Sequence, residues 1–285
     1  MRWQQIRSCA TTIAIVSIAA MLTLSSFASA AVDPENATAA GIRDNSFLVE
    51  EAYNQERGVV QHIFTLQLVF DGDDDRAWQG AFTQEWPVFS QTHQFSYTVP
   101  VNYFEADDDS VGGIGDIVLT YRLQALTETA TRPALAPRFS LILPSGDEDR
   151  GMGDGSAGYE LALPASKVVA DGWTLHGNTD VTYLPDVQGE SVTSYSLGTS
   201  AIWAVDRGFN LLLEWIGRWE EVLDDHAGGT ERDFVSAISP GLRYAYNFDD
   251  DAQLVLGLAT PIGITSDSPD WGVLVYLSFE HGFGR

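Results

Sequence analysis

The sequence predicts an all-β fold, a transmembrane antiparallel β-barrel of about 12 strands. Three observations predict it. From about Val59 to the end, stretches of roughly ten residues alternate apolar and polar side chains, as strands with one apolar and one polar face do. A secretory signal precedes these stretches. After that signal, no apolar stretch reaches the roughly 18 residues of a membrane-spanning helix.

Residues 1–30 have the composition of a signal peptide. Arg2 and Arg7 form a short basic region, residues 10–24 are mostly apolar, and residues 28–30 read Ala-Ser-Ala, a small-x-small cleavage site. Cys9 lies before the apolar run and is expected to be removed with the signal. The mature chain then has no cysteine, which excludes disulfides, thiolate metal sites and cysteine catalysis.

The chain is strongly acidic, with 40 Asp and Glu against 15 Lys and Arg and a formal net charge of −25. Removal of Arg2 and Arg7 would make the mature chain more acidic still. Such a chain does not bind nucleic acid or an anionic membrane surface through general electrostatics. An acidic, secreted, strand-patterned chain fits an outer-membrane barrel, with a water-soluble β-sandwich as the main alternative.

Residues 31–58 form an N-terminal periplasmic segment with little strand alternation. Within it, residues 47–53 can form a short amphipathic helix. Two arrangements are open: a cap that packs under the periplasmic mouth, which we prefer, and a small plug that enters the lumen.

Twelve strands follow within a barrel domain of residues 59–285, and an even number fits a closed meander with both ends in the periplasm. We place them at 59–70, 79–89, 93–104, 115–126, 133–144, 158–168, 173–184, 194–205, 209–221, 234–247, 252–263 and 271–283. The odd-numbered connections are mostly the longer ones: 71–76, 105–113, 145–157, 185–193, 222–233 and 265–270. We expect these loops to face outside and the short turns to face the periplasm.

The strand at 173–184 shows the alternation most clearly, with Trp173, Leu175, Val181 and Tyr183 on its apolar face. The strand at 271–283 has an aromatic-rich face that ends just before the C-terminus, a signal that outer-membrane barrels present to their insertion machinery. Here the chain ends in Arg285 rather than in an aromatic residue.

The polar faces of the strands predict which side chains line the lumen. Charges belong there because an arginine facing hydrocarbon at the midplane costs roughly 2–4 kcal/mol. The candidates for setting polarity and access are Glu85, Asp116, Arg122, Arg138, Glu160, His176, Asp180, Glu214, Arg218 and Arg243. These charges either select the cargo or form an ion-pair network that holds the barrel together, and both can be true at once.

Seven prolines fall within or at the ends of the predicted strands. They are Pro87, Pro100, Pro137, Pro144, Pro164, Pro240 and Pro261. Because proline lacks an amide donor for the ladder, each should mark a bulge, a kink or a strand end. Such interruptions either curve the wall or open lateral gaps in it.

Three motifs are notable: NSFLVEEAYNQE at 45–56, GIGDI at 113–117 and LPSG at 143–146. Together they resemble the transporter-like outer-membrane proteins named for the meta pathway of phenol degradation, over nearly the whole mature chain. The resemblance implies a porin-like barrel, distantly similar to channels for fatty acids and aromatic hydrocarbons, which takes up hydrophobic or aromatic compounds. It implies no catalytic residues.

The residues themselves predict no enzyme, no cofactor and no metal site. Outer-membrane lipid hydrolases use His-x-Ser on one strand face, and no histidine here has a serine two positions later. A cross-strand pair of His176 with a serine stays open. Residues 71–75 resemble the start of a calcium loop, but Arg76 replaces its glycine and Phe82 its final glutamate.

We therefore expect an outer-membrane channel or transporter for the passive uptake of small molecules, with hydrophobic or aromatic compounds as cargo. Its partners would be the lipid bilayer, lipopolysaccharide, the insertion machinery and the cargo, but not nucleic acid. One alternative is a closed structural or interaction barrel without transport, and a weaker one is an outer-membrane lipid hydrolase. Twelve strands can enclose either a water path or a lumen filled with side chains.

Overall fold

The computed structural model describes residues 42, 45–72, 75–106, 109–224, 228–248 and 252–283. The predicted signal peptide and Cys9 lie outside these residues. Within the described ranges, no helix combines the length and the apolar character needed to cross a membrane.

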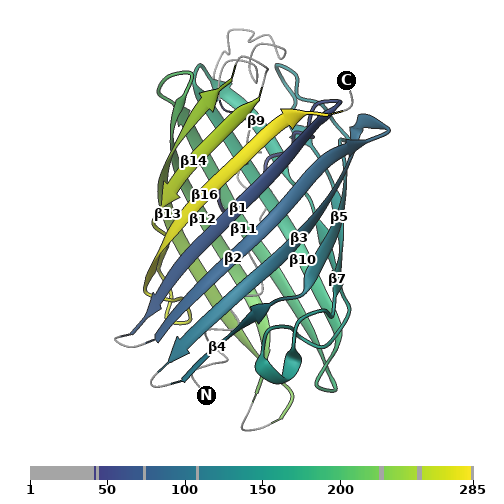
Figure 1. The fold of residues 1–285 in the computed structure, drawn as a ribbon, viewed down its shortest axis with the longest axis vertical. Helices are drawn as coiled ribbons and strands as arrows, with labels where there is room; N and C mark the ends of the chain where they lie inside the picture. Colours follow the sequence, from purple (N-terminus) through teal and green to yellow (C-terminus); the bar gives the residue numbers. More distant parts are fainter. Residues whose placement is uncertain are drawn as a thin grey trace.

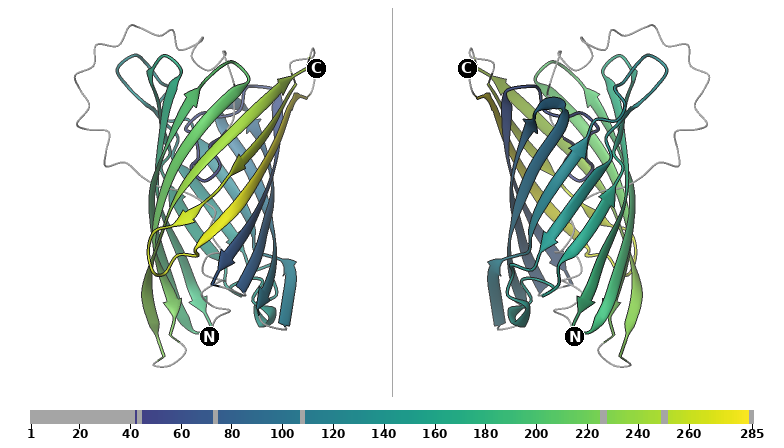
Figure 2. Two further views of the ribbon diagram at one scale, coloured as in Figure 1. Left: turned by 90° about the vertical axis from the view of Figure 1, so that its left-hand side faces the viewer. Right: turned by 90° about the vertical axis from the view of Figure 1, so that its right-hand side faces the viewer.

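Sixteen β-segments form one antiparallel sheet that closes into a barrel of twelve strands (Figures 1 and 2). The segments are β1 Val59–Asp71, β2 Asp75–Val88, β3 Ser90–Ala106, β4 Asp109–Ile114, β5 Ile117–Leu123, β6 Ala134–Leu135, β7 Arg138–Leu143, β8 Gly158–Ala162, β9 Ala165–Ala170, β10 Trp173–Val187, β11 Glu190–Ala204, β12 Phe209–Leu223, β13 Thr230–Asn247, β14 Gln253–Ala259, β15 Ile262–Gly263 and β16 Trp271–Gly282. Four strands consist of two segments each: β4 with β5, β6 with β7, β8 with β9, and β14 with β15.

The first and last strands close the barrel. β1 pairs with β16 continuously, from Val59 opposite Gly282 to Phe70 opposite Trp271. A closed sheet leaves no unpaired strand edge, which is the condition for a β-structure to cross a bilayer. We call the end that carries Val59 and Gly282 the terminal end, and the opposite end, which carries residues 72, 144–157 and 188–189, the loop end.

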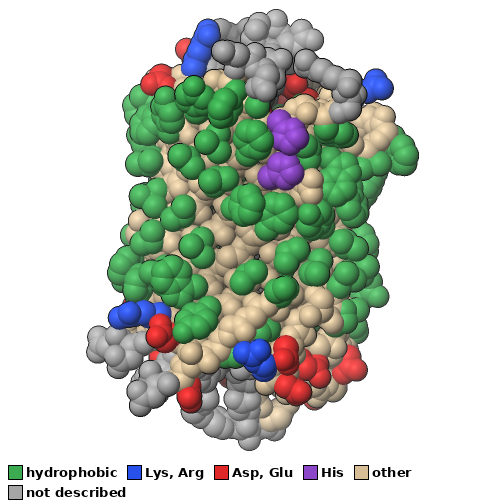
Figure 3. Space-filling view, in the orientation of Figure 1, with side chains coloured by type: hydrophobic (Ala, Val, Ile, Leu, Met, Phe, Trp, Pro, Cys, Tyr) green, Lys and Arg blue, Asp and Glu red, His purple; other side chains and the backbone are tan. Residues whose placement is uncertain are grey.

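The outward faces of the strands are apolar, as the alternation predicts. Phe64, Leu213 and Leu256 are about half exposed on the outer wall. Figure 3 shows apolar side chains over the middle of the visible wall, with acidic and basic side chains gathered at its two ends. This band matches the lipid-facing belt of an outer-membrane barrel.

Stacked aromatic rings lie toward both ends of the wall. Trp173 and Trp203 stack with ring centroids 5.8 Å apart near the terminal end, and Phe70 and Trp271 stack at 4.3 Å near the loop end. Aromatic side chains at these two heights are typical of the membrane–water interfaces.

Five of the seven prolines lie at a strand end, a break or a register shift, as predicted, whereas Pro100 and Pro240 lie inside the continuous strands β3 and β13. Pro137, Pro164 and Pro261 separate two segments of one strand, Pro144 follows β7, the β2–β3 register shifts at Pro87, and Pro100 and Pro240 lie opposite the breaks in the adjacent strands.

The predicted alternation of long and short connections is wrong in detail. β1 and β2 extend to leave only residues 72–74 between them, and β10 and β11 leave only 188–189. The connection at 124–133, at the terminal end, is longer than either. Polar sequence does not end a strand beyond the lipid, because the ladder is made by backbone groups that can continue to pair in water.

Residues 45–55 lie inside the barrel, and we call them the inner segment. Phe47, Val49 and Ala52 are almost fully buried within it. The short helix predicted over 47–53 is absent, because these residues adopt bends and extended backbone. Their backbone groups bond to side chains of the wall instead of to one another, as described below.

Candidate channel lumen

All ten predicted site residues point inward and are buried. Glu214 is fully buried, and Arg122, His176 and Arg243 are at most 3% exposed. The others, Glu85, Asp116, Arg138, Glu160, Asp180 and Arg218, are between 5% and 9% exposed. Nine of the ten lie on the predicted inward face of a strand, whereas Asp116 lies between β4 and β5 rather than within a strand.

Glu214 on β12 holds the first part of the inner segment. Its Oε1 accepts hydrogen bonds from the backbone N–H groups of Leu48 (2.9 Å) and Val49 (3.0 Å). Beside it, Arg243 donates to the carbonyl of Asn45. Buried backbone groups require partners, and here charged side chains supply them in place of helix or sheet bonds.

Arg122 on β5 holds the other part of the inner segment. Its guanidinium donates to Asn54 Oδ1 at 2.9 Å, to the Tyr53 carbonyl at 2.8 Å and to the Glu51 carbonyl at 3.2 Å. A planar guanidinium with five donors suits such a cluster of acceptors. Arg122 therefore acts as an anchor for the segment.

An ion-pair bridge crosses between the inner segment and the wall. Arg138 on β7 pairs with Glu50 of the inner segment and with Glu160 of β8. Ser140 and Thr182 also donate to Glu160, at 3.3 and 3.4 Å. Two carboxylates thus share one buried guanidinium, an arrangement that desolvation makes costly to break.

The cross-strand histidine–serine pair exists but serves the inner segment. Ser166 Oγ lies 2.7 Å from His176 Nδ1 and accepts a hydrogen bond from the Ala52 N–H at 2.7 Å. The two side chains are 0% and 2% exposed. The serine oxygen is therefore occupied by the backbone of the inner segment.

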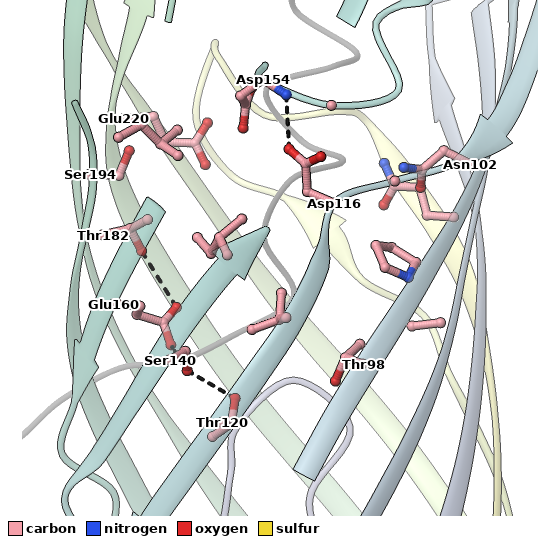
Figure 4. Close-up of a pocket in the computed structure, with 18 of the residues that line it drawn as sticks. Thr98, Asn102, Asp116, Thr120, Ser140, Asp154, Glu160, Thr182, Ser194 and Glu220 are labelled. Carbon is pink, nitrogen blue, oxygen red and sulfur yellow. Dashed lines mark hydrogen bonds between the residues drawn. The ribbon is translucent and has the colours of Figure 1, made fainter. Parts of the chain in front are cut away.

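The part of the lumen that the inner segment does not occupy is a cavity of about 720 Å³. It extends from the inner segment, where Phe47 and Glu50 line it, to Gln188 and Asp224 at the loop end. Figure 4 shows hydroxyls and carboxylates from several strands around this space. The lumen thus has two parts, a cavity at the loop end and the inner segment toward the terminal end.

Asp116 ties the long loop 144–157 to the cavity wall. Its carboxylate accepts hydrogen bonds from the Gly146 N–H at 2.8 Å and from the Asp154 N–H at 2.9 Å, the second of which is drawn in Figure 4. Asp154 lies in this loop, outside the strands. Burial, together with the negative charge of Asp116, raises the pKa of Asp154 to about 6.

The raised pKa of Asp154 predicts that acid stabilises the loop end. The folded protein holds this proton up to about pH 6, whereas the unfolded chain releases it near its ordinary pKa of about 4, so stability falls as pH rises between these values. Asp154→Asn should therefore raise the free energy of unfolding by roughly 2 kcal/mol at pH 7.5 and have little effect at pH 4. Urea unfolding at both pH values measures this. Asp149→Asn, an exposed neighbour, is the control, and an equal effect of both variants would contradict the prediction.

The inner segment is the part of the site that the strand pattern did not locate. The sequence left it as a cap or a plug, since its residues have no alternation that assigns a face. Its polar residues Asn45, Asn54 and Gln55 are buried, which is rare for exposed linkers and ordinary for a segment enclosed by polar side chains.

An antiparallel barrel with a closed seam, an apolar outer belt and a polar lumen defines the outer-membrane β-barrel class, and the protein is located in the outer membrane. The sequence profile of the family described as "Putative MetA-pathway of phenol degradation" matches residues 46–279. The chain belongs to this family, which confirms the resemblance found in its motifs.

Among solved structures, the chain is similar to the COG4313 outer membrane channel from Pseudomonas putida F1. The two share 15% sequence identity with a TM-score of 0.64, over 81% of this chain and 98% of the other. A weaker similarity is to the NanC porin, with 6% identity and a TM-score of 0.49 over 79% of this chain and all of the porin. Among curated proteins, no sequence matches significantly. At 15% identity, the likeness to the COG4313 channel shows a shared barrel fold.

Proposed function

We propose that this protein is a passive outer-membrane channel for small molecules with apolar or aromatic parts, and that the inner segment controls passage through it. The proposal depends mainly on one observation, that the lumen has two parts. A cavity of about 720 Å³ at the loop end borders the inner segment, which is held by hydrogen bonds to side chains rather than by pairing in the sheet. The family description, which refers to phenol degradation, supports this cargo, and the similarity to a solved outer-membrane channel supports the channel function. Insertion by the outer-membrane machinery and contact with lipopolysaccharide belong to the same proposal.

Catalysis is not part of the proposal. Ser166 and His176 are the one serine–histidine pair joined by a hydrogen bond among the described residues. Both are buried, and Ser166 already bonds to the inner segment. A nucleophile needs access to its substrate, which this pair lacks.

A closed structural barrel is the second candidate, and the inner segment is the observation that favours it. Glu214 accepts a hydrogen bond from the segment, and Arg122 and Gln124 donate to its carbonyls, so these side chains hold the segment across the lumen. If these contacts never open, the barrel passes nothing. The two candidates therefore differ in whether the inner segment moves.

A reversible tether distinguishes them. Ser46 Oγ on the inner segment lies 2.6 Å from Ser200 Oγ on β11, so cysteines at both positions should form a disulfide. In proteoliposomes, oxidation of Ser46→Cys/Ser200→Cys should lower the flux of 4-ethylphenol to nearly that of empty liposomes, because the tether removes the open state. Reduction should restore the flux.

Thr83→Cys/Thr98→Cys is the matched control. These residues face each other on β2 and β3 with their hydroxyls 2.8 Å apart, so their disulfide joins two wall strands without touching the inner segment. It should leave the flux unchanged. Equal flux through the oxidised and reduced Ser46–Ser200 variant would exclude movement of the inner segment, and no flux through any form would favour the closed barrel.

A further inference from the structure

The cavity is strongly acidic. Eleven Asp and Glu side chains line it, against Arg138 as the single basic residue among the described lining residues. Figure 4 shows four of these carboxylates, from Asp116, Asp154, Glu160 and Glu220, around one space. Carboxylates gathered in a low-dielectric cleft concentrate cations and repel anions.

Only part of this negative charge is compensated by the ion pairs found. Arg138 pairs with Glu50 and Glu160, Arg218 with Glu220, and Arg232 with Glu221. Other carboxylates are held by neutral donors. Asp116, for example, accepts from two backbone N–H groups. Hydrogen bonds from neutral groups fix a carboxylate without cancelling its charge.

Four buried polar atoms of the lining residues lack a hydrogen-bond partner among the described residues: Glu50 Oε2, Gln79 Nε2, Arg138 Nε and Asp154 Oδ2. Glu50 and Arg138 form an ion pair through their other atoms, so Asp154 Oδ2 and Gln79 Nε2 remain as the sites for a ligand. The Gln79 side chain is only 3% exposed. Buried polar groups in native proteins are normally paired. A ligand with an ammonium group could donate a hydrogen bond to Asp154 Oδ2, and a hydroxyl on the same ligand could accept one from Gln79 Nε2.

The same cavity has an apolar side. Ile142, Leu184, Val187 and Val192 form a buried cluster, with Val118 and Leu223 packed against it. All six also line the cavity, so they face the lumen rather than lipid. Because these apolar residues face inward, they do not contact lipid. They can instead pack against an aromatic or alkyl group of a molecule in the cavity.

We infer that the cavity takes amphipathic cations, small amines with an aromatic or apolar body, in preference to the corresponding carboxylates. The cavity volume of about 720 Å³ lies within the range of about 300–1,000 Å³ of small-molecule sites. This inference rests on the proposed channel function and names the cargo class of the same lumen.

The test compares three molecules that share a phenol ring and differ in charge: tyramine as the cation, 4-ethylphenol as the neutral molecule and 4-hydroxyphenylacetate as the anion. Uptake is measured in proteoliposomes that contain the folded mature protein, with empty liposomes as the blank. Tyramine should enter at least about tenfold faster than 4-hydroxyphenylacetate, since a focused negative potential raises local cation concentration by that order.

The variant Glu148→Gln/Asp154→Asn/Asp233→Asn removes three charges from the cavity. It should reduce the tyramine-to-anion ratio severalfold. Asp109→Asn/Asp149→Asn/Glu190→Gln removes three exposed charges at the loop end that do not line the cavity and should keep the ratio.

Each result decides between the proposals. If 4-hydroxyphenylacetate enters as fast as tyramine, or both triple variants lower the ratio equally, the cargo inference is wrong while the channel function stands. If none of the three phenols enters above the blank, the channel function fails and the cargo inference fails with it.

Discussion

Deletion of residues 31–55 is expected to raise the flux of 4-ethylphenol through the barrel by about tenfold or more. The inner segment separates the cavity from the terminal end, and an open state that is at most about 10% populated would become permanent without it. Proteoliposome uptake and single-channel conductance in planar bilayers both measure the change.

The control deletes residues 31–41 and keeps the inner segment, so its flux should match that of the mature protein. The deletion also removes the backbone groups of the inner segment that bond to Glu214 and Arg122, so the deletion variant could misfold. A second variant therefore tests the same prediction without a deletion. Phe47→Ala/Leu48→Ala keeps the chain length but removes the Phe47 ring, which lies 5.2 Å from the Tyr276 ring on β16. It should raise the flux in the same direction. Unchanged permeability in a folded deletion variant would show that the inner segment does not control passage.

Arg138→Met is expected to lower the free energy of unfolding by roughly 3–5 kcal/mol. The substitution leaves Glu50 and Glu160 without their shared guanidinium, and uncompensated buried charges of this kind cost that much. Methionine fills much of the space of the arginine stem, so the loss reports charge more than packing. The urea midpoint of the refolded barrel measures it.

Arg232→Met is the matched control. Arg232 pairs with Glu221, but its side chain is 50% exposed, and an exposed pair contributes only about 0–1 kcal/mol. Adding Glu160→Gln to Arg138→Met should recover part of the lost stability, because residues in one network are not additive. If Arg138→Met costs no more than Arg232→Met, the lumen charges do not hold the barrel together.

The strands and their faces could be predicted because both follow from local chemistry. Trp173 and Tyr183 face outward and His176 and Asp180 inward, as alternation on one strand requires. Five of the seven prolines marked strand interruptions for an equally local reason, since each lacks one ladder donor. The connections were predicted less well, because residues 185–187 pair as strand although they read as a polar loop.

The position of the inner segment depends on contacts that are distant in sequence. Glu214 is 166 residues from Leu48, and Arg243 is 198 residues from Asn45. Neither contact leaves a periodic pattern around residues 45–55. The polar residues there, Asn45 and Asn54 among them, are shown to be buried only by the structure.

Local chemistry in the sequence was sufficient to predict the barrel class, the twelve strands and the inward position of nine of the ten candidate side chains, because period-two alternation is a property of each strand alone. The three-dimensional structure was needed to show that an inner segment occupies one part of the lumen and an acidic, partly apolar cavity the other. Those features arise when side chains from distant strands converge after the barrel closes, and no single strand encodes that convergence.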